Sequence, residues 1–243
     1  MLREANDGAV SFDVRAAMTT IIYHAEARRS ERIAWLLEEL DRPYELVFKP
    51  GDVVGSFDPL RATGHPFPMA PVVQDGDDLM IESAAILETL MNRHGDGGLR
   101  PPLGSREHVR YLEWLHFAES TAWPRIQQEF INRALPPAKT PEAEARRFGG
   151  SDRVLTYYDW TLGRRPYLAG DAFTAADIQN HFVIRLGLSA AANRRGVPSQ
   201  LLQPDEEAFA PYPAVADYMA RLGERPAFQR MMKLTMPQGW PAI

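Results

Sequence analysis

The pair Glu82-Ser83 brings an acid and a hydroxyl to the predicted start of a helix. We predict that Ser83 caps a helix running to His94, with Gly95 as its stop. The N-terminus of a helix carries partial positive charge, so the Ser83 hydroxyl and nearby N–H groups suit a carboxylate. Glu82 adds an acceptor for an ammonium group. The pair can therefore hold a small charged ligand, although a plain helix cap beside a surface acid has the same sequence.

Cysteine chemistry is excluded, because the 243 residues contain no cysteine. Disulfides, thiolate zinc sites and a thiol nucleophile supplied by the protein all require that side chain. We also predict no metal site, because the histidines show no His-x-x-x-His pair or other metal-ligand spacing. The six histidines are His24, His65, His94, His108, His116 and His181.

Composition and charge narrow the choice of partners. Hydrophobic residues make up 45% and charged residues 24%, as in ordinary globular proteins. A formal net charge of −5 argues against nucleic acid, which needs a basic surface. No apolar run approaches the ~20 residues that cross a bilayer, so no membrane segment is predicted. Residues 1–17 lack the apolar core of a signal peptide, and we predict a disordered N-terminal extension on a cytoplasmic protein.

Residues 18–95 alternate between strand and helix signals. Short β-rich segments predict strands at 19–23 and 44–48. Between them, apolar residues at helical spacing predict a helix over 31–40. A short helix is expected near 57–62, within a stretch that is otherwise dense in proline and glycine.

A hairpin and a helix complete this region. The dipeptide Asp75-Gly76 is a strong turn signal between brief strands at 71–74 and 79–81. The helix at 83–94 follows. The resulting order, βαβ(α)ββα, is the thioredoxin-like arrangement.

The remainder of the chain predicts helices alone. Residues 96–105 (DGGLRPPLGS) have the composition of a linker, and residues 106–243 then form a second domain. The helical segments expected there are 106–128, 151–162, 174–188, 212–222 and 227–234. The fold class is therefore an α/β thioredoxin-like domain followed by an all-α helical-bundle domain.

Several phrases of the sequence resemble one known family. The segment HPFPMAPVVQDGDDLMIESAAILETL, residues 65–90, is similar to the glutathione transferase segment in which HPxxxxPVL, a DG hairpin and ESxAI follow one another. In the second domain, PYLAGDAFTAADI (166–178) and ERPAF (224–228) resemble its later helices. The similarity runs from Thr19 to about Met232. It corresponds to a bacterial and fungal branch without a catalytic cysteine.

The resemblance implies that glutathione is the co-substrate and that four residues form its main site. The turn matching Ala70-Pro71 carries a cis-proline in the family and pairs with the cysteinyl part of glutathione. The pair matching Glu82-Ser83 grips the γ-glutamyl end. His65 opens the matching His-Pro phrase and is a further glutathione-binding candidate, with loop capping as its other role.

Activation of the glutathione thiol has three candidates. Relatives often place serine or cysteine in the loop after the first strand, and alignment puts Arg28 at that position. Tyr23 matches the catalytic tyrosine of other relatives, and Ser30 offers a hydroxyl near the first helix. A second departure is Met69, where relatives often use a lysine for the glycine carboxylate of glutathione.

The resemblance also implies a second substrate, a small hydrophobic electrophile bound between the domains. Its expected pocket is formed by Tyr111, Trp114 and Phe117, although an aromatic stripe at helical spacing also fits a core. These expectations describe a homodimeric, detoxifying glutathione transferase that conjugates the electrophile or reduces peroxides. The alternative is a non-catalytic glutathione-binding or interaction module, because a fold alone does not determine function.

Overall fold

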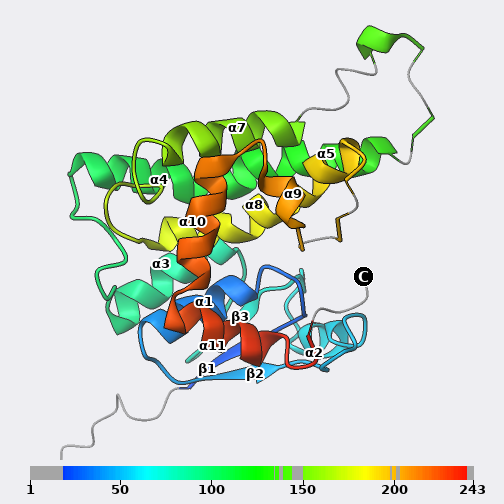
Figure 1. The fold of residues 1–243 in the computed structure, drawn as a ribbon. Coiled ribbons are helices and arrows are strands. Elements are labelled where there is room, and N and C mark those ends of the chain that lie inside the picture. Colours follow the sequence, from blue (N-terminus) through cyan, green and yellow to red (C-terminus); the bar gives the residue numbers. More distant parts are fainter. Residues whose placement is uncertain are drawn as a thin grey trace, which may run out of the picture.

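The computed structural model describes residues 19–133, 135–136, 139–143, 150–197, 199–200 and 203–239. The predicted N-terminal extension, 1–17, lies outside the described residues. A small sheet with its helices forms one domain, and a layer of longer helices packs against it (Figure 1). The expected two-domain fold is confirmed, with the sheet first in the chain.

The sheet has four strands in the order β2-β1-β3-β4. They span Thr20–Tyr23 (β1), Tyr44–Val47 (β2), Val72–Asp75 (β3) and Asp78–Met80 (β4). β1 pairs with β2 in parallel and with β3 antiparallel, so that Tyr23 lies opposite Val72. This register places the loop that leaves Tyr23 beside the turn that enters β3.

Three helices belong to this domain, namely α1 (Glu31–Glu39), α2 (Phe57–Ala62) and α3 (Ser83–His94). The apolar stripe of α1 explains its position, because Ile33, Leu36 and Leu37 are fully buried in the main hydrophobic core. α1 packs against α3 and also against α8 of the second domain. α1 therefore lies between the sheet and the second domain, where it contacts both.

The second domain is all-α, as predicted. Residues 106–133 run continuously as α4, a π-helical stretch η2, and α5. The central α8 is buried over most of its length. The elements are α4 (Arg106–Phe117), η2 (Ala118–Ala122), α5 (Trp123–Arg133), α7 (Gly150–Leu162), α8 (Ala175–Arg194), α9 (Glu206–Phe209), α10 (Pro213–Gly223) and α11 (Pro226–Thr235).

The Thr-x-x-Asp box at the start of α8 has a folding role. Thr174 caps the helix, and Asp177 accepts a hydrogen bond from the Thr174 backbone N–H at 2.8 Å. Asp177 also accepts from the Tyr218 hydroxyl at 2.9 Å and from the Leu168 N–H at 3.0 Å. This buried carboxylate thus joins α8 to α10 and to the loop before α8.

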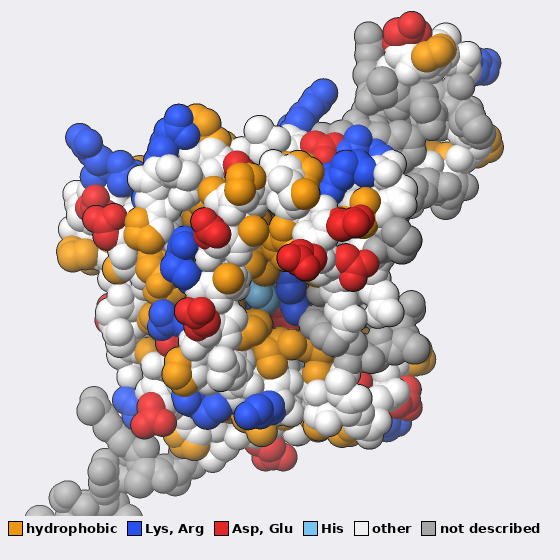
Figure 2. All heavy atoms as spheres, viewed as in Figure 1, with side chains coloured by type: hydrophobic (Ala, Val, Ile, Leu, Met, Phe, Trp, Pro, Cys, Tyr) orange, Lys and Arg blue, Asp and Glu red, His pale blue; other side chains and the backbone are white. Residues whose placement is uncertain are grey.

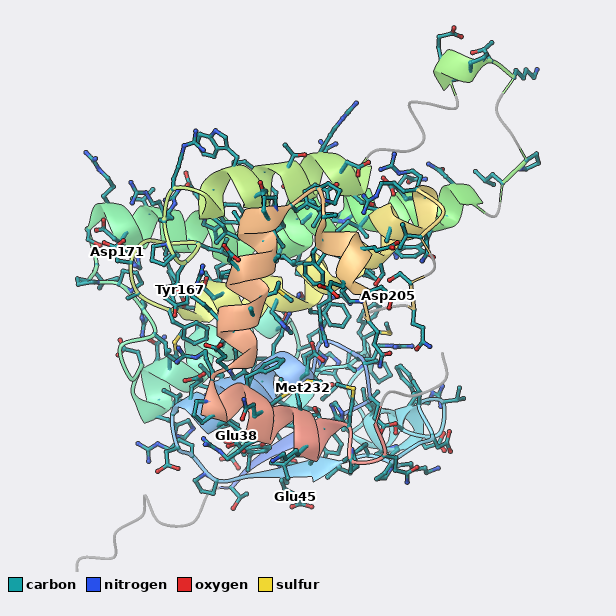
Figure 3. All side chains as sticks on the ribbon, viewed as in Figure 1. Glu38, Glu45, Tyr167, Asp171, Asp205 and Met232 are labelled. Carbon is teal, nitrogen blue, oxygen red and sulfur yellow. The ribbon has the colours of Figure 1, made fainter. Side chains whose placement is uncertain are left out.

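The last helix, α11, returns to the first domain and packs along α1 (Figure 1). Arg225 donates two hydrogen bonds of 2.7 Å to the carboxylate of Glu39. Arg230 binds Glu38 at 2.6 Å, and Figure 3 shows Glu38 where α1 and α11 lie side by side. Nothing in the sequence indicated that the C-terminal helix covers the first domain.

His24 adds a buried link between β1 and α11. Its Nε2 lies 2.9 Å from the carbonyl oxygen of Thr235, which can only accept, so Nε2 carries the proton. Burial lowers the pKa of His24 to about 4, so the ring is neutral and Nδ1 is an acceptor. The Ser30 hydroxyl, 2.7 Å from Nδ1, therefore donates to it.

The neutral state of His24 predicts a loss of stability in acid. The pKa of His24 is about 4 in the fold, against a usual value of 6.5, so the unfolded chain binds the proton first as pH falls. Between about pH 7.5 and pH 5, the unfolding free energy should fall by about 2 kcal/mol through this group. Urea unfolding of the wild type and of His24→Gln at both pH values measures this change in the unfolding free energy. The variant should lose less stability on acidification, and equal losses would contradict the prediction.

Candidate active site

A pocket of about 170 Å³ opens where the two domains meet. Its walls come from the turn before β3, the start of α3, the start of α1, and the π-helical stretch η2. The lining residues are Arg29, Phe67, Met69, Ala70, Pro71, Ile81, Glu82, Ser83 and Glu119. All four main residues expected to bind glutathione therefore line one pocket.

The Ala70-Pro71 turn forms one wall. Its peptide bond is cis, as expected from the resemblance. Within the described part of the chain, the N–H and C=O of Ala70 make no hydrogen bond. A buried residue normally pairs these groups. Ala70 therefore offers a free donor and acceptor to an extended peptide.

Glu82 and Ser83 form the opposite wall, with one correction to the prediction. Glu82, not Ser83, is the N-cap of α3, and Ser83 is the first helical residue. Glu82 adopts a φ of 69°, a left-handed conformation that is uncommon outside glycine and clusters at functional sites. Its exposed carboxylate makes no hydrogen bond with a described residue. It is therefore open to a cationic ligand group.

The Ser83 hydroxyl points into a polar network between the domains. Ser83 is only 4% exposed. Its Oγ accepts hydrogen bonds from Arg32 Nη1 at 2.8 Å and from Gln179 Nε2 at 3.2 Å. Arg32 comes from α1 and Gln179 from α8. The residue thus joins the pocket to both domains.

Glu119 is the acidic partner of two arginines beside the pocket. Arg32 Nη1 lies 2.6 Å and Arg29 Nε 3.0 Å from the same oxygen, Oε1. Burial alone would raise the pKa of Glu119, but the two positive charges outweigh it and hold that pKa below its ordinary value. The Arg29 guanidinium also stacks on Trp123, 4.1 Å from the ring centre. The pocket therefore holds a carboxylate and a guanidinium that are fixed in place.

Ser30 is the least suited of the three candidates for thiol activation. It is fully buried, and its proton is donated to Nδ1 of His24. The Ala25 N–H approaches the same oxygen at 3.4 Å. A hydroxyl bound in this way has no proton left for a thiolate. Its geometry indicates a structural role at the start of α1.

Tyr23 and Arg28 are the other two candidates for thiol activation. Tyr23 is half-buried and packs against a small cluster that includes Ala70 of the pocket. Arg28 is also half-buried, and its Nη1 donates to the carbonyl of Ala27 at 2.9 Å. Burial and the neighbouring charge of Arg29 lower the pKa of Arg28. Neither side chain lines the pocket itself.

His65 supports its own loop. Its Nδ1 accepts from the Phe67 N–H at 3.0 Å, which is the loop-capping role. His65 does not line the pocket, whereas Phe67 and Met69 of the same loop do. Those two side chains are 62% and 52% exposed, so the pocket has an apolar rim.

The aromatic residues expected to bind the second substrate are mostly core. Tyr111 and Trp114 are buried, and neither lines the pocket that contains Glu82 and Ser83. Trp114 stacks on Tyr158 inside the helical domain. Phe117 is half-buried and packs edge-on against Trp114. Helical spacing does not separate a buried stripe from a pocket wall. Tyr111 and Trp114 lie in the core, and their role in binding a second substrate stays a prediction.

A larger apolar pocket of about 540 Å³ lies between α8, α9, α10 and α11. Figure 2 shows hydrophobic side chains around a hollow at the centre of this face. The lining residues are Arg185, Gln203, Pro204, Glu206, Phe209, Ala216, Met219, Ala220, Phe228 and Met232. In the described ranges, no cluster of three or more histidine and acidic residues could hold a metal ion. The same ranges contain no helix of the length and apolarity that crossing a bilayer requires.

Two family models match the chain. The glutathione S-transferase N-terminal domain matches residues 22–101, and the C-terminal domain matches residues 122–226. Glutathione S-transferase 3 of Schizosaccharomyces pombe is 31% identical over 221 residues, which cover 85% of this chain and 84% of that protein. Glutathione S-transferase 3 of Zea mays is 30% identical and covers 82% and 86%. The chain belongs to the glutathione S-transferase family.

Solved structures agree with the fold. The glutathione transferase URE2P8 of Phanerochaete chrysosporium, solved with oxidized glutathione, superposes with a TM-score of 0.70 at 20% identity. The superposition covers 91% of this chain and 97% of the URE2P8 chain. A sphingomonad glutathione S-transferase complexed with glutathione gives 0.65 at 25% identity and covers 88% and 98%.

The ion pairs of Glu119 with Arg29 and Arg32 predict that removing the Glu119 carboxylate destabilises the fold. Glu119→Ala would leave Arg32, which is 1% exposed, without its acidic partner. Removing one partner of a buried ion pair costs about 3 kcal/mol or more. Urea denaturation should therefore show a large loss. The matched control is Glu45→Ala, since Glu45 points away from the sheet into solvent (Figure 3), and it should change stability by less than about 0.5 kcal/mol. Equal effects of the two variants would contradict the role of Glu119.

Proposed function

We propose that this glutathione transferase binds glutathione in the pocket between the domains and directs its thiolate at a small hydrophobic electrophile. The observation that carries the proposal is the convergence of Glu82, Ser83 and the Ala70 backbone on one pocket. A carboxylate acceptor, a hydroxyl at a helix N-terminus and an unpaired peptide group match the three kinds of group in a γ-glutamyl peptide.

The arrangement of these groups gives the bound peptide a direction. The γ-glutamyl end lies at Glu82 and Ser83, and the cysteinyl backbone pairs with Ala70. Because Tyr23 is opposite Val72 in the sheet, the loop that follows Tyr23 runs beside the Ala70-Pro71 turn. The thiol then faces that loop and the start of α1. The Phe67 and Met69 rim beyond it suits an apolar electrophile.

Tyr23 and Arg28 are the groups proposed to activate the thiol. A free thiol has a pKa of about 8.5, and each unit of depression requires about 1.4 kcal/mol of extra stabilisation of the thiolate. The N-terminus of α1 stabilises negative charge, and one hydroxyl or guanidinium donor adds to it. Conjugation needs this thiolate, and so does peroxide reduction.

The proposal includes a homodimer that forms through an exposed aromatic surface on α7. The exposed aromatic side chains Tyr157 and Trp160 on α7 stack on each other with ring centres 6.2 Å apart. Tyr157 also stacks on buried Trp114, which makes an apolar surface continuous with the core and suited to a second copy of the chain. We place the homodimer in the cytoplasm, where a reducing glutathione pool supplies the free thiol.

Ser83→Ala tests the glutathione site. Removing a hydroxyl that binds a carboxylate should raise the Kd for glutathione about tenfold or more. The control is Ser120→Ala, because the exposed Ser120 hydroxyl binds only its own helix at His116 and should leave the Kd unchanged. Titration calorimetry measures the Kd, and conjugation of a chlorodinitrobenzene measures turnover. A wild type that does not bind glutathione would refute the proposal, and tight binding without turnover on any class of electrophile would identify a non-catalytic binding module.

Thiol activation is tested separately, through the pKa of the bound thiol. The ultraviolet absorbance of the thiolate, followed against pH, should show a pKa about one to two units below 8.5 in the wild type. Tyr23→Phe or Arg28→Ala should return it toward 8.5, whichever residue supplies the donor. If neither variant changes the pKa of bound glutathione, both assignments fail.

A further inference from the structure

The Ser83 hydroxyl is surrounded by donors. Arg32 Nη1 and Gln179 Nε2 both approach Oγ, at 2.8 Å and 3.2 Å. A guanidinium and an amide NH₂ can only donate, and a hydroxyl oxygen has two lone pairs and one proton. The two donors therefore occupy both lone pairs. In this arrangement no acceptor among the described residues bonds to the Ser83 proton. The Gln179 amide oxygen, Oε1, is buried without a hydrogen-bond partner, and turning the amide round would make it that acceptor.

Burial and further contacts hold the two donors, Arg32 and Gln179, in place beside Ser83. Arg32 is 1% exposed, and its Nη1 is also held by Glu119 at 2.6 Å. Its Nε and Nη2 have no hydrogen-bond partner among the described residues, so Ser83 and Glu119 hold the guanidinium through Nη1 alone. Gln179 is fully buried on α8 and comes from the second domain. Neither donor can turn away to solvent.

We propose that Arg32 and Gln179 are positioning residues that make Ser83 an obligate hydrogen-bond donor toward the pocket. Ser83 then selects an acceptor and favours the α-carboxylate of the γ-glutamyl group, because the charge strengthens the hydrogen bond. A hydroxyl free to rotate would accept an N–H group equally well and would not distinguish a carboxylate from its amide. This inference rests on the proposed glutathione site and assigns its selectivity to two residues outside the pocket wall.

The direction of the proton can be reversed by one substitution. Gln179→Glu puts a carboxylate acceptor beside Ser83 and should raise the Kd for glutathione about tenfold or more, because the proton turns away from the ligand. Gln179→Met has a similar length and only a weakly accepting sulfur, so it should raise the Kd less than about threefold. KM for glutathione should follow the Kd in both variants, with kcat at saturation unchanged.

A double-mutant cycle separates this effect from simple charge repulsion. In a Ser83→Ala background, Gln179→Glu should add less than about a threefold loss, because the proton that it redirects is absent. A full tenfold loss in that background would assign the effect to the new charge and overturn the proposal. The proposal also fails if Gln179→Met weakens binding as much as Gln179→Glu. Tighter binding by Gln179→Met would overturn it too, since Ser83 would then have been donating to Gln179.

A second measurement does not depend on the stability of the Gln179 variants. This measurement compares two ligands: glutathione, and glutathione whose γ-glutamyl α-carboxylate is converted to a primary amide. Ser83→Ala should raise the Kd for glutathione by a larger factor than it raises the Kd for the amide. Equal losses for the two ligands would overturn the inference while leaving the glutathione site intact. No binding of glutathione by the wild type would instead refute the proposed function, and this inference with it.

Discussion

Two adjacent charged residues at the start of α1 tie the domains together. Arg32 reaches Glu119 of η2 and Ser83 of α3, and Glu31 pairs with Arg185 of α8. A charge removed from water costs several kcal/mol unless a partner compensates it. Each domain therefore supplies the counter-charge for a buried charge of the other. The pairs hold the helical layer in one position over the sheet, and the pocket lies at the boundary that they define.

The chemistry of the pocket follows from this constraint. Ser83 belongs to the first domain, but one of its two donors comes from the second. Glu119 also comes from the second domain and reaches the pocket wall. At the far end of α1, Glu38 binds Arg230 of α11 and Glu39 binds Arg225, the N-cap of that helix, so the C-terminal helix reinforces the same interface. Ligand recognition and domain packing therefore share residues.

In the first domain, the local elements were predictable to within one residue. In the second domain, the helix predicted over 174–188 continues to Arg194, and the one predicted over 106–128 continues to Arg133. The helix at 83–94 and the short helix at 57–62 begin and end where the sequence pattern placed them. The N-cap of α3 was predicted at Ser83 and lies one residue earlier, at Glu82. Glu82 adopts a left-handed conformation that no spacing of residue types reveals. The aromatic stripe of α4 was ambiguous for a different reason. Helical spacing shows which side chains share a face, but not whether that face meets core or solvent.

The sequence by itself determined the order of strands and helices and, through its resemblance to a family, the two walls of the pocket. Hairpins, stripes and short motifs arise from residues close in the chain, and such neighbours leave a readable pattern. Only the tertiary structure decided how Ser83 is held. Its donors lie 51 and 96 positions away, and Glu119 lies 87 positions from Arg32. Hydrogen bonds over such separations leave no periodicity, because only the packing of one domain on the other brings these residues together.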